Sequence, residues 1–132
     1  MSKLDGKVAL ITGAAKGLGR GIAETYARHG ARLCLLDADP SVEEVAKQLH
    51  VQRGTQAISI VASVTDKEQV RRAAKATHEA FGSLDIACCN AGICRLAPFE
   101  DFPDEDLEAS IDVNIRGVWN TCQSVIPYML EA

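Results

Sequence analysis

The chain has 132 residues, of which 47% are hydrophobic, and its 14 Lys and Arg against 18 Asp and Glu give a net charge of −4. This length predicts one domain, and the apolar content is too high for a disordered chain. The net charge argues against nucleic acid as a partner, because nucleic-acid-binding surfaces are basic. Apolar runs such as Val8 to Ile11 are far shorter than the ~20 residues of a membrane span. The first six residues lack a signal-peptide core. We therefore expect a cytoplasmic protein with no membrane partner.

The cysteines agree with that compartment: Cys34, Cys88, Cys89, Cys94 and Cys122. Their number is odd and no pair has CxxC spacing, so we predict neither a disulfide framework nor a metal site. Cys88 and Cys89 are neighbours in a predicted strand, so their side chains should point to opposite faces of the sheet. Packed side chains are therefore favoured over a redox pair.

Short apolar runs and helical patterns alternate along the first half of the chain. Residues 7–12 form an apolar run that ends in glycine, as buried parallel strands do. The next helix has apolar residues at helical spacing and ends near Gly30; these residues are Leu18, Ile22, Ala23 and Tyr26. Residues 32–36 form the second strand. Asp39 is expected to cap the second helix, with Pro40 at its first position.

The second half repeats this alternation. Residues 57–61 form the third strand, and Thr65 with Glu68 fits a capping box for a helix that ends at Gly82. Residues 84–89 form the fourth strand. After a loop, a single helix is predicted over 107–129, and Pro127 is expected to kink it or weaken its last turns.

Four strands separated by helices predict an α/β protein with a parallel sheet. Right-handed crossovers then give the strand order 3-2-1-4, with helices on both faces. This arrangement is half of a doubly wound Rossmann fold.

A glycine-rich turn, Thr12 to Gly19, joins the first strand to the first helix. Gly13 allows a tight turn, and Gly17 and Gly19 let the backbone approach a ligand and the sheet. Free amide hydrogens at the helix start favour an anion, such as a dinucleotide pyrophosphate. No Gly-Lys-Ser/Thr closes the turn, so it is not a P-loop. Taken alone, the turn also fits a plain strand-to-helix connection. Gly21 is expected to serve helix packing only.

Asp37 ends the second strand, 18 residues past Gly19. A carboxylate there can accept hydrogen bonds from both hydroxyls of an adenine ribose and would repel a 2′-phosphate. The sequence therefore predicts NAD, with NADP as the less favoured cofactor. Lys16 argues the other way, because its charge could pair with that phosphate; the alternative for Lys16 is a solvated surface lysine.

Three motifs in order resemble those of the short-chain dehydrogenase/reductase family. They are the spacing Gly13-xxx-Gly17-x-Gly19, the run Cys89-Asn-Ala-Gly92, and the run Val113-Asn-Ile-Arg-Gly117. The resemblance covers the whole chain as the family's N-terminal half. It implies an oxidoreductase that transfers hydride reversibly between NAD(H) and a small alcohol or carbonyl substrate. It also implies a homo-oligomer in the full-length form, with residues 1–132 as an incomplete NAD(P)-binding Rossmann domain.

The resemblance assigns roles to individual residues. Asn114 would be the one catalytic residue present, tethering a water in a proton relay. The cofactor would be held by Thr12, Gly13, Lys16, Gly17, Leu18, Gly19, Asp37, Ser63, Val64, Asn90, Ala91 and Gly92. Among these, Ser63 and Val64 would border the adenine, and Thr12 would steady the loop that begins at Asn90. Ser63 stands where the family usually has aspartate, and Cys89 where it has asparagine.

The family's catalytic serine and its Tyr-xxx-Lys pair have no counterpart in this sequence. Neither Tyr26 nor Tyr128 is followed by lysine four residues later. The fourth strand would be an apolar edge without the lysine or proline that usually protects edges. The last helix is apolar on more than one face. We therefore expect the N-terminal half of a longer enzyme, inactive alone.

Two further readings stay open. A chain without the tyrosine and lysine could be a non-catalytic half-domain that binds a dinucleotide or a partner. A Rossmann methyltransferase also uses a glycine-rich turn and an acid after the second strand, but the Asn90 and Asn114 motifs argue against it.

Overall fold

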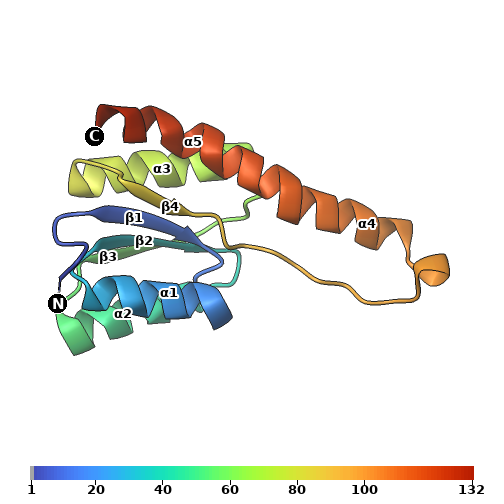
Figure 1. Cartoon of the computed structure of the whole chain (residues 1–132), viewed down its shortest axis with the longest axis horizontal. Helices are drawn as coiled ribbons and strands as arrows, with labels where there is room; N and C mark the ends of the chain where they lie inside the picture. The colour runs from blue at the N-terminus through green and yellow to red at the C-terminus, as the bar shows by residue number, and fades with distance from the viewer. Residues whose placement is uncertain (1) are drawn as a thin grey trace.

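The computed structural model describes residues 2–132, which contain a four-stranded parallel sheet in the order β3-β2-β1-β4 (Figure 1). The strands are β1 (Val8–Thr12), β2 (Arg32–Asp37), β3 (Ala57–Val61) and β4 (Ile86–Cys88). β1 pairs with β2 from Val8 to Thr12 and with β4 from Ala9 to Ile11. The predicted α/β fold and strand order are confirmed. β4 is shorter than the predicted 84–89.

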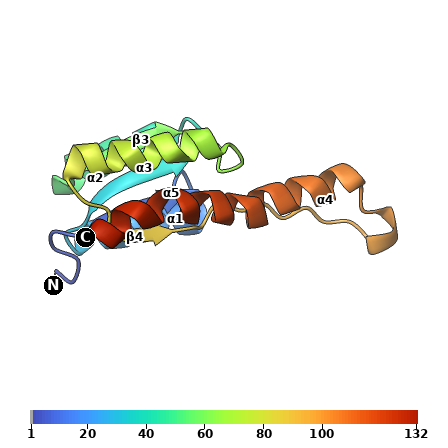
Figure 2. The same cartoon turned by 90° about the horizontal axis from the view of Figure 1, so that it is seen from above.

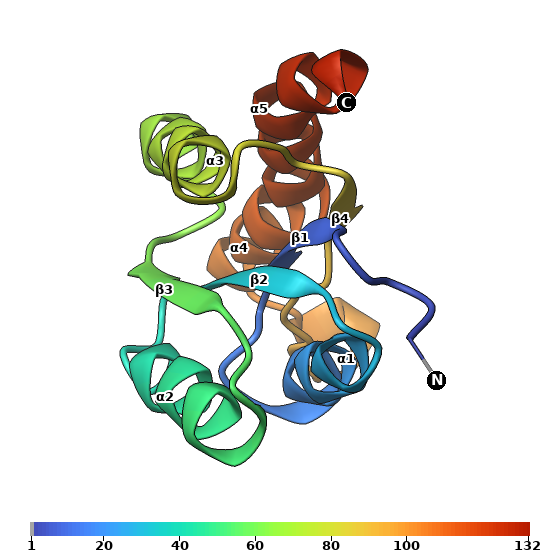
Figure 3. The ribbon, with the colours of Figure 1, turned by 90° about the vertical axis from the view of Figure 1, so that its left-hand side faces the viewer.

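Helices cover both faces of the sheet, as predicted. The helices are α1 (Gly17–Arg28), α2 (Val42–Arg53), α3 (Lys67–Phe81), α4 (Asp104–Ile111) and α5 (Gly117–Glu131). Figure 3 looks along the sheet and shows α1 and α2 on one side, with α3 and α5 on the other. None of the helices in the described part of the chain has both the length and the apolar character of a membrane span.

The core forms because β1 and β2 are apolar on both faces. Every residue of β1 is buried, as expected for a central parallel strand. Ala9 and Ile11 pack with Leu33 and Leu35 on the side of α1 and α2. Leu10 packs on the opposite side in a second cluster that also includes residues of α3 and α5. The two clusters pack on the two faces of the sheet and hold its strands together, so the carboxyl ends of the parallel strands lie along the same edge of the sheet.

The predicted single helix over 107–129 is interrupted. A five-residue π-helix, η2 (Asp112–Arg116), separates α4 from α5, and a 3₁₀ turn, η1 (Phe99–Asp101), precedes them. Figure 2 shows η1 and α4 as an arm that extends away from the sheet. The π-helix begins nine residues after Pro103, and the spacing of apolar residues in the sequence gives no sign of it. α5 continues through Pro127 to Glu131, so the chain stays helical beyond the proline.

Two predicted helix starts need correction. The side chain that caps α3 is Asp66, whose Oδ1 accepts the N–H groups of Glu68 and Gln69. Thr65 instead bonds the Ser63 hydroxyl at 2.7 Å. At the second helix, Asp39 accepts the N–H of Ser41 at 2.9 Å, but the α-helix itself begins two residues later than predicted, at Val42.

Candidate functional site: a cleft at the carboxyl ends of the strands

A cleft of about 570 Å³ opens where the strands end. β1 is central there, since the chain passes from β1 to β2 on one side and returns to β4 on the other. Such switch points are the ligand sites of open α/β sheets. The cleft is lined by Gly13, Lys16, Leu36, Asp37, Ala38, Asp39, Ala62, Ser63, Val64, Asn90, Ala91, Gly92, Ile93 and Val113.

The glycine-rich turn forms one wall. Gly13 has φ +65°, and a Cβ there would lie 2.9 Å from the backbone of Ala91. A Cβ on Gly19 would overlap the Gly13 carbonyl, so both positions require glycine. The first turn of α1 has no side-chain cap and no acidic residue. Its N–H groups therefore stay available for an anion.

Two residues near the start of α1 are placed differently from the sequence expectation. Leu18 was grouped with the apolar face of α1, but its side chain is 82% exposed and does not line the cleft. Gly21 was assigned to packing, yet a Cβ there would meet no atom within 4 Å. The helix buries Ala23 and Ala27 instead.

Thr12 ties the turn to the loop after β4. Its hydroxyl accepts the N–H groups of Asn90 and Ala91, each at 3.0 Å, and donates to the Cys88 carbonyl at 3.4 Å. The Asn90 amide donates to the carbonyls of Thr12 and Gly13, both at 3.2 Å. Thr12 is 1% exposed, so it shapes the cleft without lining it.

Three charged side chains gather at the end of β2. Asp37 accepts the Ala15 N–H through one carboxylate oxygen and the Asp39 N–H through the other, both at 2.9 Å. Each oxygen keeps a lone pair for a ligand hydroxyl. Hydrogen bonds from Ser41, together with the charge of Lys16, lower the pKa of Asp39. The two acids and one lysine give this corner a net negative charge.

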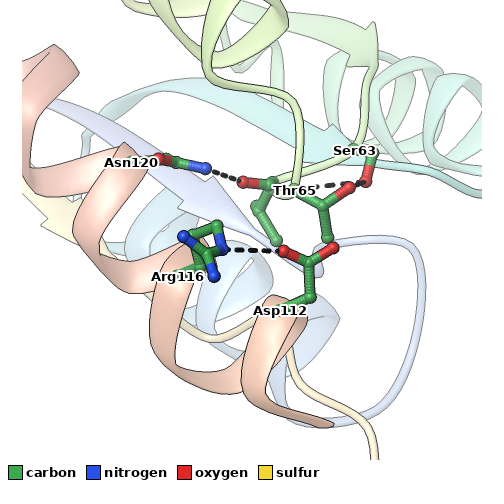
Figure 4. A network of polar contacts seen from close by, with 6 residues as sticks. Ser63, Thr65, Asp112, Arg116 and Asn120 are labelled. Carbon is green, nitrogen blue, oxygen red and sulfur yellow. Dashed lines mark hydrogen bonds and ion pairs between the residues drawn. The ribbon is translucent and has the colours of Figure 1, made fainter. Parts of the chain in front are cut away.

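Ser63 and Val64 form the opposite wall, at the end of β3. The Ser63 N–H donates to the Gln69 side chain at 2.8 Å, and the Ser63 hydroxyl pairs with Thr65 (Figure 4). Val64 is buried against Val70 and Ala73 of α3. The Ser63 hydroxyl therefore makes its hydrogen bonds with Thr65, within its own loop.

Asn114 lies in the π-helix η2 and is exposed. Its amide oxygen accepts the Ile93 N–H at 2.8 Å, and its amide nitrogen donates to the Ile93 carbonyl at 2.9 Å. The side chain therefore holds the loop that borders the cleft. π-Helical turns inside α-helices often occur at functional sites. The water-tethering role of Asn114 stays a prediction.

Neither tyrosine is arranged as an acid or base at the cleft. The Tyr26 hydroxyl lies 3.3 Å from the Cys88 sulfur on the α1 side of the sheet. This hydrogen bond, with burial, raises the pKa of Tyr26, which keeps its phenol neutral. Tyr128 stacks against His78 of α3 at a ring separation of 4.9 Å, and neither residue lines the cleft.

The paired cysteines point to opposite faces, as predicted. Cys88 faces Tyr26 and the α1 side of the sheet. Burial, with the neighbouring Cys122 thiol of α5, raises the pKa of Cys89 to about 11. All five cysteines are free.

The structure brings together the residues predicted at the cofactor site from all four strand ends. Gly13, Lys16, Asp37, Ser63, Val64, Asn90, Ala91 and Gly92 line the cleft. Thr12, Gly17, Leu18, Gly19 and Asn114 do not line it. Six lining residues were not among those predicted for the cofactor site: Leu36, Ala38, Asp39, Ala62, Ile93 and Val113. Ala38 and Ala62 directly follow β2 and β3 and could have been found from that position, whereas Val113 reaches the cleft only through the π-helix.

These residues fit a dinucleotide. A turn with uncommitted N–H groups suits a pyrophosphate, and a carboxylate at the end of β2 suits ribose hydroxyls. Because Gly19 has no Cβ, the first turn of α1 can pack directly against the Gly13 carbonyl. Among residues 2–132, no group of three or more His, Cys, Asp or Glu could hold a metal ion.

Known proteins are similar to this chain in sequence and in fold. Oxidoreductase UcpA of Escherichia coli is 49% identical over 130 residues, covering 98% of this chain and 49% of UcpA. A short chain dehydrogenase from Mycobacterium paratuberculosis bound to NAD matches 98% of this chain and 53% of its own at 30% identity, with a TM-score of 0.93. An alcohol dehydrogenase from Thermococcus sibiricus, complexed with 5-hydroxy-NADP, is 32% identical. The match covers 95% of this chain and 54% of that protein's chain, with a TM-score of 0.90.

The chain spans about half the length of these relatives. The sequence model for short chain dehydrogenases matches residues 7–132, nearly the whole chain. On this match, and on the cleft that the three motifs build, the chain belongs to the short-chain dehydrogenase/reductase family of oxidoreductases.

Proposed function

We propose that residues 1–132 form the NAD(P)-binding Rossmann domain of an oxidoreductase that transfers hydride reversibly between NAD(H) and a small alcohol or carbonyl compound. The observation that carries the proposal is the cleft itself, which has the glycine-rich turn on one side and Asp37 at the end of β2. The nicotinamide dinucleotide, when bound, supplies the hydride chemistry, while this chain binds and orients it.

The contacts on each wall support specific roles. The N–H groups at the start of α1 bind the pyrophosphate, and Asp37 binds the adenosine ribose. Ser63 and Val64 border the adenine, with a weaker polar contact than an aspartate would give, because Ser63 bonds Thr65. The loop from Asn90 to Gly92 lies beneath the nicotinamide ribose.

The charges of this chain favour NAD over NADP. Both kinds of cofactor occur among the solved relatives, with NAD in one and 5-hydroxy-NADP in another. Here Lys16 acts on Asp39, so part of its attraction for a 2′-phosphate is offset. Asp37 adds a second negative charge at the same corner.

The 132-residue chain alone binds the cofactor without turning over a substrate. The arrangement of its tyrosines supports this: Tyr26 is bound to Cys88, and Tyr128 stacks on His78. Hydride transfer to a carbonyl also needs a proton donor at hydrogen-bonding distance. The whole protein acts as a cytoplasmic homo-oligomer. The five free cysteines of this chain support the cytoplasmic placement.

Titration with NADH, followed by nicotinamide fluorescence, tests the proposal. We expect NADH to bind more tightly than NADPH, and S-adenosylmethionine not to compete. Asp37→Asn should weaken NADH binding by about tenfold or more, because a charge-assisted hydrogen bond contributes roughly 1.5–3 kcal/mol. Asp104→Asn, on the exposed start of α4, is the matched control.

Two results contradict the proposal. A chain that is folded by circular dichroism and binds neither NADH nor NADPH would exclude dinucleotide binding. Oxidation of NADH by the 132-residue chain with a panel of aldehydes and ketones would exclude the non-catalytic part.

A further inference from the structure

A buried asparagine on α5 reaches across to the wall of the cleft. Asn120 is 2% exposed, and its amide donates to the main-chain carbonyl of Val64 at 2.9 Å (Figure 4). The bond is buried and joins positions 56 residues apart. A buried carbonyl without a donor is costly. The position of the Val64 backbone therefore depends on the Asn120 amide.

The same helix also touches the Val64 side chain. A Cβ at Gly117 would lie 2.6 Å from the Val64 Cγ2 atom. The backbone of α5 thus rests directly on Val64, and a larger residue would push the two apart. Val113 of η2 packs against the cluster that contains Val64. The segment 113–120 therefore packs against Val64 over consecutive helical turns.

This segment contacts a second wall through Asn114. Six residues before Asn120, Asn114 exchanges two hydrogen bonds with Ile93, which lines the cleft. Val64 lines the cleft at the end of β3. The two walls are otherwise carried by separate loops, after β3 and after β4. The segment 113–120 therefore contacts both of these walls.

We propose that Asn120 is a positioning residue for the bound dinucleotide, which acts through Val64 rather than by touching the ligand. By fixing Val64 against α5, Asn120 sets the distance between the adenine wall and the Asn114–Ile93 wall. A dinucleotide spans both walls and so requires both at once. The inference rests on the proposed dinucleotide-binding function.

Substitutions on the same helix separate positioning from general packing. Asn120→Leu keeps the size of the side chain and removes the donor, and we expect it to weaken NADH binding about tenfold. Asn120→His places a ring nitrogen where the amide nitrogen stands, and it should recover most of that affinity. Ser124→Ala is the matched control, because Ser124 is buried one turn later but donates only to the Asn120 carbonyl of its own helix.

The affinity for AMP supplies a second readout. AMP contacts only the adenosine end, so Asn120→Leu should weaken AMP binding less than NADH binding. A uniform loss for both ligands, or equal losses in Asn120→Leu and Ser124→Ala, means a structural role only and overturns the proposal.

Nuclear magnetic resonance of the ¹⁵N-labelled chain without ligand tests the coupling even if NADH does not bind. Asn120→Leu should shift the Ile93 amide and speed its hydrogen exchange, while Ser124→Ala should leave it unchanged. An unshifted Ile93 amide in a folded Asn120→Leu chain overturns the proposal, whereas failure of the wild-type chain to bind dinucleotide overturns the proposed function instead. If Asn120→Leu does not fold, Asn120→Ala, which also removes the donor, takes its place in both measurements, and unchanged NADH affinity and Ile93 exchange in that variant overturn the proposal.

Discussion

Thr12 and Asn90 exchange hydrogen bonds across the point where β1 and β4 end. The Thr12 hydroxyl accepts the Asn90 N–H at 3.0 Å, and the Asn90 amide donates to the Thr12 carbonyl at 3.2 Å. Because β1 also leads into the glycine-rich turn, this one exchange fixes the loop after β4 relative to the wall that the turn forms.

Removing the Thr12 hydroxyl should therefore destabilise the chain and disturb the cleft together. Thr12→Val keeps the shape but leaves the N–H groups of Asn90 and Ala91 without that acceptor, at a cost of about 1–3 kcal/mol. Urea unfolding measures this change. Thr121→Val is the control, since Thr121 is equally buried but donates only to the Gly117 carbonyl within its helix. Equal stability of the two variants would show that the Thr12 contacts contribute nothing special.

Gly19 and Gly21, two of the three glycines of α1, should respond oppositely to substitution by alanine. A Cβ at Gly19 overlaps the Gly13 carbonyl, so Gly19→Ala should abolish NADH binding and lower the melting temperature. A Cβ at Gly21 meets nothing. Gly21→Ala should therefore stabilise the chain by about 0.5–1 kcal/mol through helix propensity, without changing NADH affinity. Calorimetry and fluorescence titration measure both quantities. A stabilising Gly19→Ala would contradict the close approach.

The start of α3 shows what the sequence could not settle. Thr65 with Glu68 fits a capping box, yet Asp66 caps the helix, because the Thr65 hydroxyl is drawn to Ser63. Asp66→Ala should cost about 1 kcal/mol of unfolding free energy. Thr65→Ala should cost less, because Thr65 carries no cap bond. Thermal unfolding of the two variants decides between the capping residues, and a larger loss for Thr65→Ala would favour the sequence reading.

Sequence predicted the elements that depend on local pattern and missed those that depend on distant contacts. The alternation of apolar runs with helices was enough for the strand order, and glycine spacing with a strand-end acid was enough for Gly13 and Asp37. Val113 reaches the cleft only because η2 is π-helical. Through Val113 and Asn114, η2 contacts the loops that follow β3 and β4, and no spacing within the helix reveals these contacts.

Thiol labelling of the native chain should rank the cysteines by exposure and pKa. Burial raises the pKa of Cys34 to about 11, from a reference value of 9.0, and the same cause acts at Cys89. Because the thiolate is the nucleophile, a rise of two units lowers its fraction about a hundredfold at pH 8. Reactivity at both sites should grow tenfold per pH unit until the pH reaches the raised pKa. Exposed Cys94 should react first, and Cys94→Ser should remove the fast phase. A mass spectrum with early Cys34 adducts would contradict this ranking.

The corner formed by Lys16, Asp37 and Asp39 should set the ratio of NADPH to NADH affinity. Asp39→Asn removes a negative charge beside Lys16, so NADPH affinity should rise while NADH affinity changes little. Lys16→Gln removes the only cation lining the cleft within the described residues, so NADPH affinity should fall further than NADH affinity. Both groups are exposed, so each substitution should change the ratio by only about a few-fold, and by less at high salt. Parallel titrations with the two cofactors at low and high ionic strength measure the ratio. If both substitutions shift it in the same direction, charge at this corner does not govern cofactor choice.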